Sequence, residues 1–402
     1  MKGFFPESDL KRKAPIPVLA QCGKCGLYKT CITDRMKVSG KGKKGLLVVG
    51  EAPGRTEDEQ GKPFVGSSGQ LVQETLLRYG IELRRDCWVT NAVICRPPNN
   101  SLPPKAITYC QPNLIQTVKD LQPTAILVLG NAPLKSLVGW LWKEDPGGIT
   151  RWSGQQIPSQ QLNAWVCPTF HPSYLLHERK GEGRNVRKNE ALELYFDKHF
   201  QAFSELKGRP WEVVPKYEQE VKIYHDPDQA IPAIKSFLNG GPIAFDWETD
   251  RSKADSSDST VLCIGISNEN TTIAFPWNGP AVGVAKELLA SDIPKIGWNI
   301  RFEQRWARRQ GITINNWKWD GMLVAHAMDS RRGTKGLEYQ SFVVLGHPSY
   351  KDLSYLMKTD GGYDRNRLHE ASKKKLLTYC GTDALLEWHI AQKQMGKLGV
   401  SI

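Results

Sequence analysis

The sequence has no apolar run long enough to cross a membrane anywhere in its 402 residues. Residues 1–10 also lack the apolar core of a secretion signal. We therefore expect no membrane partner and a cytoplasmic location. Disulfides are rare in that compartment, so the nine cysteines should be thiols or metal ligands. The sequence also lacks an internal repeat, because its two halves share no motif.

Acidic residues are in the minority. The chain has 54 lysines and arginines against 42 aspartates and glutamates, which gives a formal net charge of +12. That balance favours a polyanionic partner, with nucleic acid ahead of a membrane surface. A basic but solvated surface is the alternative, and charge alone leaves it open. The length exceeds one ordinary core, so we expect two domains.

The first half alternates strand-like apolar runs with helical stretches, which predicts a parallel sheet with helices on its faces. The segment 190–203 should be a helix that closes this domain, which we place at residues 1–205. The predicted strands are 46–49, 87–93, 125–129 and 165–168.

A glycine- and proline-rich loop over residues 50–69 follows the first apolar run and precedes an amphipathic stretch at 70–79. Glycines let the backbone approach a ligand, and such loops carry sites in α/β folds. The loop reads Gly-Glu-Ala-Pro-Gly, then an acidic pair, then Gly-Lys-Pro-Phe-Val-Gly-Ser-Ser-Gly. This string resembles the first motif of the family-4 uracil-DNA glycosylases, and the resemblance covers about residues 20–200. The acidic pair begins with Glu57, to which the sequence assigns no role.

The resemblance implies a pocket in which a flipped-out uracil is read and released. Phe64 would stack on the base beside Gly50, and the Asn91 amide would read the uracil edge. His171 would donate to uracil O2 as negative charge builds, and Glu51 would orient water or stabilise the sugar cation. Each residue alone has an ordinary explanation in a core or a turn, but their order together favours the site.

The segment after His171 is basic, and in the family it presses on the DNA minor groove. We expect Leu175 to fill the gap left by the flipped base. Arg179, Arg184 and Lys188 would contact phosphates, with a solvated basic loop as the alternative for each.

Four cysteines have a spacing that suits a metal centre: Cys22, Cys25, Cys95 and Cys110. Four thiolates fit either a tetrahedral zinc or an iron–sulfur cluster, and their chemistry alone does not separate the two. The family resemblance implies a [4Fe–4S] cluster with a structural role. Cys31 and Cys87 match no ligand position.

A proline- and glycine-containing linker is expected at 206–221, followed by a second domain at 222–402. Asp246 and Glu248 lie two residues apart on a predicted strand, so both point to one face. Two carboxylates on one face are costly unless a cation holds them, which indicates a divalent metal. A surface strand with two acids is the alternative.

Residues 220–395 resemble the 3′–5′ exonuclease domain of family-A DNA polymerases, of the type with four acids and a tyrosine. The resemblance implies an RNase-H-like (DnaQ-type) mixed sheet with helices, and two-metal phosphodiester hydrolysis. Tyr379 would orient the attacking water. Two Mg²⁺ or Mn²⁺ ions would be held by Asp246, Glu248, Glu303 and Asp383. Glu303 departs from the family, in which aspartate is usual.

These resemblances predict a bifunctional DNA enzyme that excises uracil and degrades DNA from 3′ ends. No polymerase palm motif is present, so proofreading for a separate polymerase in a phage-like system, in a bacterial host cytoplasm, is one expected role. One alternative is that one domain is catalytically silent and acts as a DNA-binding or uracil-sensing module that tethers a polymerase. Another is a zinc-stabilised DNA-binding scaffold without chemistry.

Overall fold

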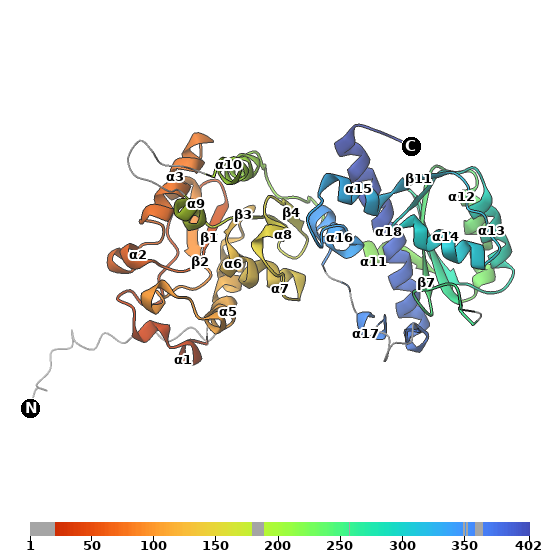
Figure 1. Cartoon of the computed structure of the whole chain (residues 1–402), viewed down its shortest axis with the longest axis horizontal. Coiled ribbons are helices and arrows are strands. Elements are labelled where there is room, and N and C mark those ends of the chain that lie inside the picture. The colour runs from red at the N-terminus through yellow and green to blue at the C-terminus, as the bar shows by residue number, and fades with distance from the viewer. Residues whose placement is uncertain (1–20, 179–188, 257, 349, 351–352, 358–364) are drawn as a thin grey trace, which may run out of the picture. The chain divides into compact units, whose positions relative to one another are not determined.

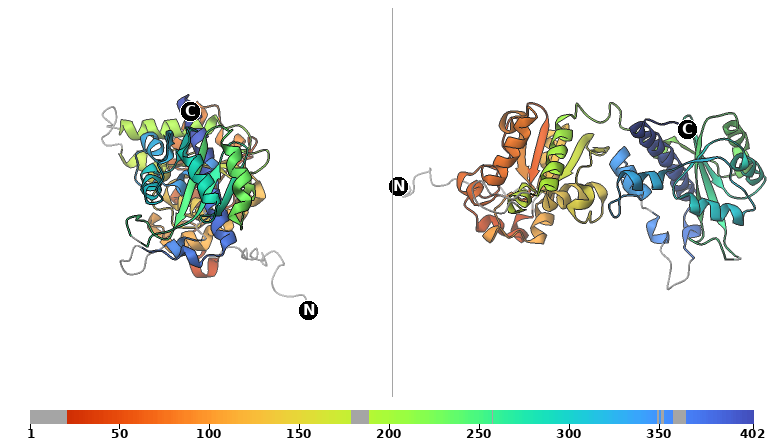
Figure 2. Two further views of the ribbon diagram at one scale, coloured as in Figure 1. Left: turned by 90° about the vertical axis from the view of Figure 1, so that its right-hand side faces the viewer. Right: turned by 45° about the horizontal axis from the view of Figure 1, so that its top comes forward.

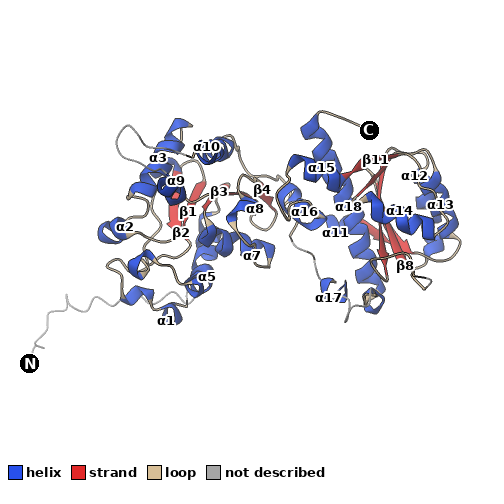
Figure 3. Ribbon diagram, viewed as in Figure 1, coloured by secondary structure: helices blue, strands red, loops and turns tan. Residues whose placement is uncertain are grey.

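The structure is a computed structural model that describes residues 21–178, 189–256, 258–348, 350, 353–357 and 365–402. The chain forms two compact units, with the main boundary between Pro210 and Trp211. In each unit helices pack against strands, as Figure 3 shows. Within the described ranges, no helix is both long enough and apolar enough to span a membrane.

The first unit contains a five-stranded sheet in the order β2-β1-β3-β5-β4. Pairing is parallel between β1 and β2, β1 and β3, and β3 and β5, which confirms the predicted parallel α/β sheet. Every residue of β1 and β3 is buried, as expected for strands covered on both faces. The strands are β1 (Leu46–Gly50), β2 (Cys87–Asn91), β3 (Ala125–Leu129), β4 (Ile157–Ser159) and β5 (Ala164–Thr169).

Two long helices supply apolar residues to a core against one face of this sheet. Val72 and Leu76 of α3 and Phe196 and Phe200 of α10 pack together with strand residues such as Leu127. The α-helices of the unit, most of which are labelled in Figure 1, are α1 (Cys22–Cys25), α2 (Arg55–Gln60), α3 (Ser67–Arg78), α4 (Leu83–Asp86), α5 (Pro104–Leu121), α6 (Asn131–Pro133), α7 (Gly139–Trp142), α8 (Ile149–Trp152), α9 (Pro172–Glu178) and α10 (Glu190–Ser204).

The second unit contains a six-stranded mixed sheet in the order β11-β10-β7-β8-β9-β6. The pairs β7–β8 and β8–β9 are antiparallel, whereas β7–β10, β10–β11 and β6–β9 are parallel, which confirms the predicted mixed sheet. The strands are β6 (Val221–Ile223), β7 (Ile243–Thr249), β8 (Val261–Ser267), β9 (Thr272–Pro276), β10 (Lys295–Gly297) and β11 (Trp317–Asp320).

The helices of the second unit are α11 (Tyr217–Glu220), α12 (Ile231–Phe237), α13 (Ala281–Ala290), α14 (Ile300–Arg309), α15 (Gly321–Met328), α16 (Leu337–Leu345), α17 (Ser354–Met357) and α18 (Lys373–Leu398). Helix α11 falls within the segment expected as a linker. Its Tyr217 is buried in an apolar cluster with Leu386 and Ile390 of α18. The end of the expected linker is therefore folded as part of the second unit.

Helix α18 lies across the strands of the second sheet (Figure 2) and packs against β7, β8 and β9. Glycines allow this close approach. A Cβ on Gly265 of β8 would lie 2.4 Å from the carbonyl oxygen of Cys380, and one on Gly381 would lie 2.3 Å from Val221 Cγ1. Two residues beyond Gly381, the chain places Asp383 against the sheet.

Candidate active sites

A cavity of about 520 Å³ opens in the first unit at the carboxyl ends of its strands. Gly50, the last residue of β1, is paired with Asn91, the last residue of β2, in the parallel ladder. Strand β2 ends two residues earlier than expected, because the chain bends at Ala92. The cavity lining includes all five residues that the sequence placed in this pocket: Gly50, Glu51, Phe64, Asn91 and His171.

Gly50 separates the two groups expected to bind the base. A Cβ at this position would lie 2.5 Å from Asn91 Oδ1 and 2.7 Å from Phe64 Cζ. Phe64 and Asn91 are only 7% and 5% exposed, so neither can retreat into solvent to make room. Only glycine therefore lets the aromatic ring and the amide converge at the end of β1.

The loop that carries Phe64 is held by a set of hydrogen bonds that the sequence did not reveal. Phe64 has φ +59°, a strained conformation for a residue with a side chain. Glu57 Oε1 accepts hydrogen bonds from the backbone N–H groups of Val65 (3.0 Å) and Gly66 (2.7 Å). The Phe64 carbonyl accepts from Gln73 Nε2 and from an Arg84 guanidinium nitrogen, both at 3.1 Å.

These four bonds fix the backbone on both sides of the Phe64 ring. They give Glu57 the structural role that its sequence position left open. No local pattern predicts it, because the loop reaches Glu57 only after it folds back onto α2.

The imidazole of His171 is held in one tautomer. The backbone N–H of Ser173 donates to His171 Nδ1 at 3.2 Å, and Ser173 Oγ lies 2.6 Å from the same nitrogen. An Nδ1 that accepts a backbone N–H carries no proton, so the proton of the neutral ring sits on Nε2. Burial, with a smaller contribution from the charge of His177, lowers the pKa of His171 to about 4. The ring is therefore a neutral hydrogen-bond donor at neutral pH. Burial also raises the pKa of Glu51.

The position of α9 corrects one expectation about DNA contact. Leu175 is 2% exposed and packs in the apolar core of the first unit, so it is not available to fill a gap in a duplex. Leu176, the next residue, lines the cavity instead. The three basic residues expected to contact phosphates, Arg179, Arg184 and Lys188, lie outside the described residues.

The four cysteines come together from three parts of the first unit. Cys22 and Cys25 lie in α1, Cys110 lies in α5, Cys95 follows β2, and all four line one small pocket. A tetrahedral zinc would hold its sulfurs about 3.8 Å apart, since each Zn–S bond is about 2.3 Å long. Among the described residues, no three cysteine sulfurs all lie within 4.8 Å of one another. As they lie in this structure, the sulfurs are therefore spaced more widely than a single tetrahedral zinc requires.

A fifth cysteine, which matched no ligand position, lies beside this pocket. The side chain of Cys31 hydrogen-bonds that of Cys95.

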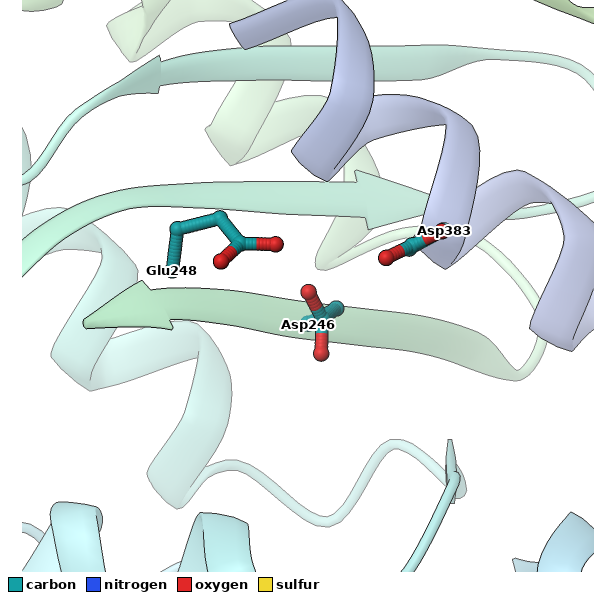
Figure 4. A group of neighbouring side chains, drawn as sticks. All are labelled: Asp246, Glu248 and Asp383. Atoms are coloured by element: carbon teal, nitrogen blue, oxygen red, sulfur yellow. The ribbon is translucent and has the colours of Figure 1, made fainter. Parts of the chain in front are cut away.

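In the second unit, a carboxylate oxygen from each of Asp246, Glu248 and Asp383 lies within 4.8 Å of the other two (Figure 4). The first two come from β7 and the third from α18. Trp247, between the two acids, is buried in the core on the opposite face of the strand, as the alternation of a strand requires. The structure thus brings these three expected ligands to one point.

In the part of the chain that the structure describes, none of the three acids forms an ion pair with a lysine or an arginine. Burial raises the pKa of Asp383 to about 7. Burial, followed by the charge of Asp383, raises the pKa of Asp246 well above its ordinary value, and burial with both aspartates does the same for Glu248. A divalent cation is the group that would restore all three to the charged form.

Two tyrosines contact Asp383. Tyr379, one helical turn earlier in α18, hydrogen-bonds its carboxylate. Tyr350 also donates its hydroxyl to Asp383 Oδ1 at 2.5 Å, with the two rings 5.5 Å apart. Tyr350 lies in a loop with no recognisable motif, so the sequence did not indicate it.

Glu303 lies in the first turn of α14, outside the group of three. Asp320 fixes the start of that helix by accepting the backbone N–H groups of Asn299 (3.2 Å) and Ile300 (3.1 Å). The Glu303 carboxylate is buried, and its Oε2 has no hydrogen-bond partner among the described residues. Burial, and then the charge of Asp246, raises the pKa of Glu303 well above its ordinary value.

Comparison with protein families matches each unit to a different family. The uracil DNA glycosylase superfamily model matches residues 38–196, and a 3′-5′ exonuclease model matches residues 221–398. The type-4 uracil-DNA glycosylase of Pyrobaculum aerophilum is 38% identical over 165 residues, which cover 40% of this chain and 82% of that protein. The type-4 enzyme of Archaeoglobus fulgidus is 41% identical over 162 residues, which cover 40% of this chain and 80% of that protein.

Among solved structures, the catalytic core of RRP6 from Trypanosoma brucei is 15% identical, with a TM-score of 0.33, and the match covers 44% of this chain and 46% of that one. The Aedes aegypti Nibbler EXO domain is 12% identical, with a TM-score of 0.34, and the match covers 46% of this chain and 92% of that one.

Proposed function

Because the chain belongs to the type-4 uracil-DNA glycosylase family and carries a 3′–5′ exonuclease domain, we propose that it is a bifunctional DNA enzyme. Its first unit excises uracil by hydrolysing the N-glycosidic bond. Its second unit removes nucleotides from DNA 3′ ends by hydrolysing phosphodiester bonds. The observation that carries the first activity is the convergence of Phe64, Asn91 and His171 on one cavity.

Uracil recognition falls to Phe64 and Asn91. A base that enters the cavity stacks on the Phe64 ring, and the Asn91 amide donates to a carbonyl oxygen and accepts from N3–H. Both side chains are buried and wedged against Gly50, so they are in place before the base arrives. Such preorganisation favours one base shape over another.

Bond cleavage uses His171 and Glu51. As the C1′–N1 bond breaks, its electron pair passes to the uracil ring, and the Nε2–H of neutral His171 donates to the developing charge on O2. In its charged form Glu51 stabilises the positive sugar and orients a water. The water oxygen bonds to C1′ and passes a proton to the Glu51 carboxylate, and the uracil anion takes up a proton on release, which leaves an abasic site and free uracil. We extend the unit's contact with the minor groove to Leu176, which lines the same cavity.

We assign Cys22, Cys25, Cys95 and Cys110 as the ligands of a [4Fe–4S] cluster, because all four line one pocket. In this proposal the cluster is structural. The four thiolates tie α1 and the segment after β2 to α5, which otherwise share a small apolar contact. Because the side chain of Cys31 hydrogen-bonds that of Cys95, one more thiol lies at the edge of this site.

In the second unit we assign Asp246, Glu248, Glu303 and Asp383 as ligands of two Mg²⁺ or Mn²⁺ ions. When bound, the ions activate the attacking water and neutralise charge at the scissile phosphate. Tyr379 positions that water, and Tyr350 holds the carboxylate of Asp383 in place. Acting on 3′ ends, this activity would proofread for a separate DNA polymerase.

The test uses the full chain and a 5′-labelled oligonucleotide with one internal uracil. One reaction contains EDTA and is followed by alkali, which cleaves abasic sites; the other contains Mg²⁺ and no alkali. We expect an alkali-dependent cut at uracil in EDTA, and a ladder of shortened products only with Mg²⁺. No cut in EDTA would make the first unit a DNA-binding or uracil-sensing module, and no ladder with Mg²⁺ would make the second unit the silent one.

A further inference from the structure

Helix α18 begins with three consecutive lysines that no motif singled out: Lys373, Lys374 and Lys375. All three are exposed, and none of them forms an ion pair with another residue that the structure describes. The backbone N–H of Lys375 donates to Ser372 Oγ at 3.4 Å, so the helix start is capped by its own chain. The surface that this turn presents therefore consists of the three ammonium groups.

The position of these lysines works against the stability of the helix. The N-terminus of an α-helix is the positive end of its dipole, and acids are favoured there whereas cations are disfavoured. The first turn of α18 contains no acid that could offset the three charges. A local rule that is broken without a structural gain is typical of a functional surface.

One side of α18 leads from this turn to the group of three acids. Lys375, Tyr379 and Asp383 follow one another at intervals of four residues, so they lie along the same side of the helix. Figure 4 shows Asp383 on α18 beside Asp246 and Glu248 of the neighbouring strand. The rise from Lys375 to Asp383 is about 12 Å, since each helical residue adds about 1.5 Å.

This length identifies the part of a substrate that could reach the lysines. Stacked DNA has a phosphate about every 3.4 Å along each strand, so about four nucleotides cover the distance. The single nucleotide that leaves in each turnover is too short to do so. Only the remaining strand, on the 5′ side of the bond that is cut, extends that far.

We propose that Lys373, Lys374 and Lys375 bind phosphates of the DNA strand whose 3′ end lies at the acids of the exonuclease site. The inference rests on the proposed exonuclease function and adds the path of the substrate to it. Phosphates supply the counter-charge that the first turn of α18 lacks. The competing explanation is a solvated basic turn that contacts no substrate, in which case the loss of its charge leaves DNA degradation unchanged.

The experiment measures Mg²⁺-dependent shortening of a single-stranded oligonucleotide without uracil by the full chain. The variant is Lys373→Gln/Lys374→Gln/Lys375→Gln, and KM and kcat are determined from about 50 to about 200 mM salt. Each phosphate contact contributes about 0.7 to the slope of log KM against log salt for a single strand, so the slope should fall by about 2. Over this fourfold range of salt, the wild-type KM should therefore rise about 20-fold more than that of the variant, with kcat nearly unchanged.

Lys397→Gln is the matched control, because Lys397 is an exposed lysine in the last turn of the same helix. This control should keep the wild-type KM and salt dependence. Thermal melting checks that the variants fold, and the triple variant should melt no lower than wild type because its lysines oppose the helix dipole. If the triple variant does not fold, Lys375→Gln replaces it and should lower the slope by about 0.7.

A wild-type KM with a wild-type salt dependence in the folded triple variant, or in Lys375→Gln when that replaces it, would overturn the inference. Equal losses in Lys397→Gln would also overturn it, because the effect would then belong to net charge and not to this turn. Failure of wild type to shorten the oligonucleotide with Mg²⁺ would instead overturn the proposed exonuclease function, so the two failures are distinguishable.

Discussion

Gly50→Ala is the substitution that most sharply tests the geometry of the uracil pocket. The added methyl group would lie 2.5 Å from Asn91 Oδ1 and 2.7 Å from Phe64 Cζ, well inside ordinary contact distance. Gly50 does not have a positive φ, so alanine adds no backbone strain at this position. The change therefore acts only on the two side chains that would read the base.

Overpacking of this kind costs about 1–3 kcal/mol of folding free energy. For a domain of this size, that lowers the melting temperature by roughly 2–4 °C per kcal/mol. The effect on catalysis should be larger, because a shift of about 1 Å in a positioning group can lower a rate by roughly 100-fold. We expect a folded variant whose uracil excision falls by about that factor.

The assay is single-turnover release of uracil from an oligonucleotide in EDTA, together with a thermal melt. Gly148→Ala is the control, because Gly148 also lacks a positive φ and has nothing within 4 Å of the added Cβ. Nuclease activity should be unchanged in both variants. Excision by Gly50→Ala at the wild-type rate would refute the assignment of Phe64 and Asn91 as the base-reading pair.

Three further outcomes follow from the first unit. Glu57→Gln should lower uracil excision by about tenfold, since the loop that carries Phe64 loses two charge-assisted hydrogen bonds. The melting temperature should stay nearly unchanged, and excision at the wild-type rate would contradict the role of Glu57 in holding this loop. The pKa of His171 is about 4 in the folded chain and 6.5 in its ordinary state, so the unfolded chain binds the proton first as the pH falls. Stability should therefore decline between pH 6.5 and pH 4, and melting curves of His171→Gln should decline less over that window; equal slopes would contradict this. Leu176→Ala should reduce excision from duplex DNA without loss of stability, whereas Leu175→Ala should destabilise the fold by about 2–5 kcal/mol in denaturant titrations; the opposite pattern would restore Leu175 as the residue that meets DNA.

Much of the fold was predictable because local apolar patterns dominate it. The runs that form β1 and β3 are buried at every position, so their apolar character alone marks them as interior strands. Strand β4 is only three residues long, and helix α5 contains a proline at position 112, so neither gave a clear local pattern. The lengths of these elements are set by their neighbours in the fold.

The residues of the candidate sites likewise divide into those that the sequence indicated and those that only the fold revealed. Asn91 and Asp246 were found because each belongs to a motif on a strand, where the side-chain direction follows from the strand itself. Glu57 and Tyr350 acquire their partners from other parts of the chain only after folding, so their sequence neighbours say little about them. Whether Leu175 or Leu176 faces the cavity depends on the rotation of the short helix α9 about its axis, and the sequence position of the two leucines does not determine that rotation.

The central claim is that one chain carries two independent active sites. The most direct test compares Asn91→Ala with the double variant Asp246→Ala/Glu248→Ala on one substrate that contains an internal uracil and a free 3′ end. Asn91→Ala should lose excision and keep Mg²⁺-dependent shortening, and the double variant should do the reverse. Loss of both activities in either folded variant would contradict the claim.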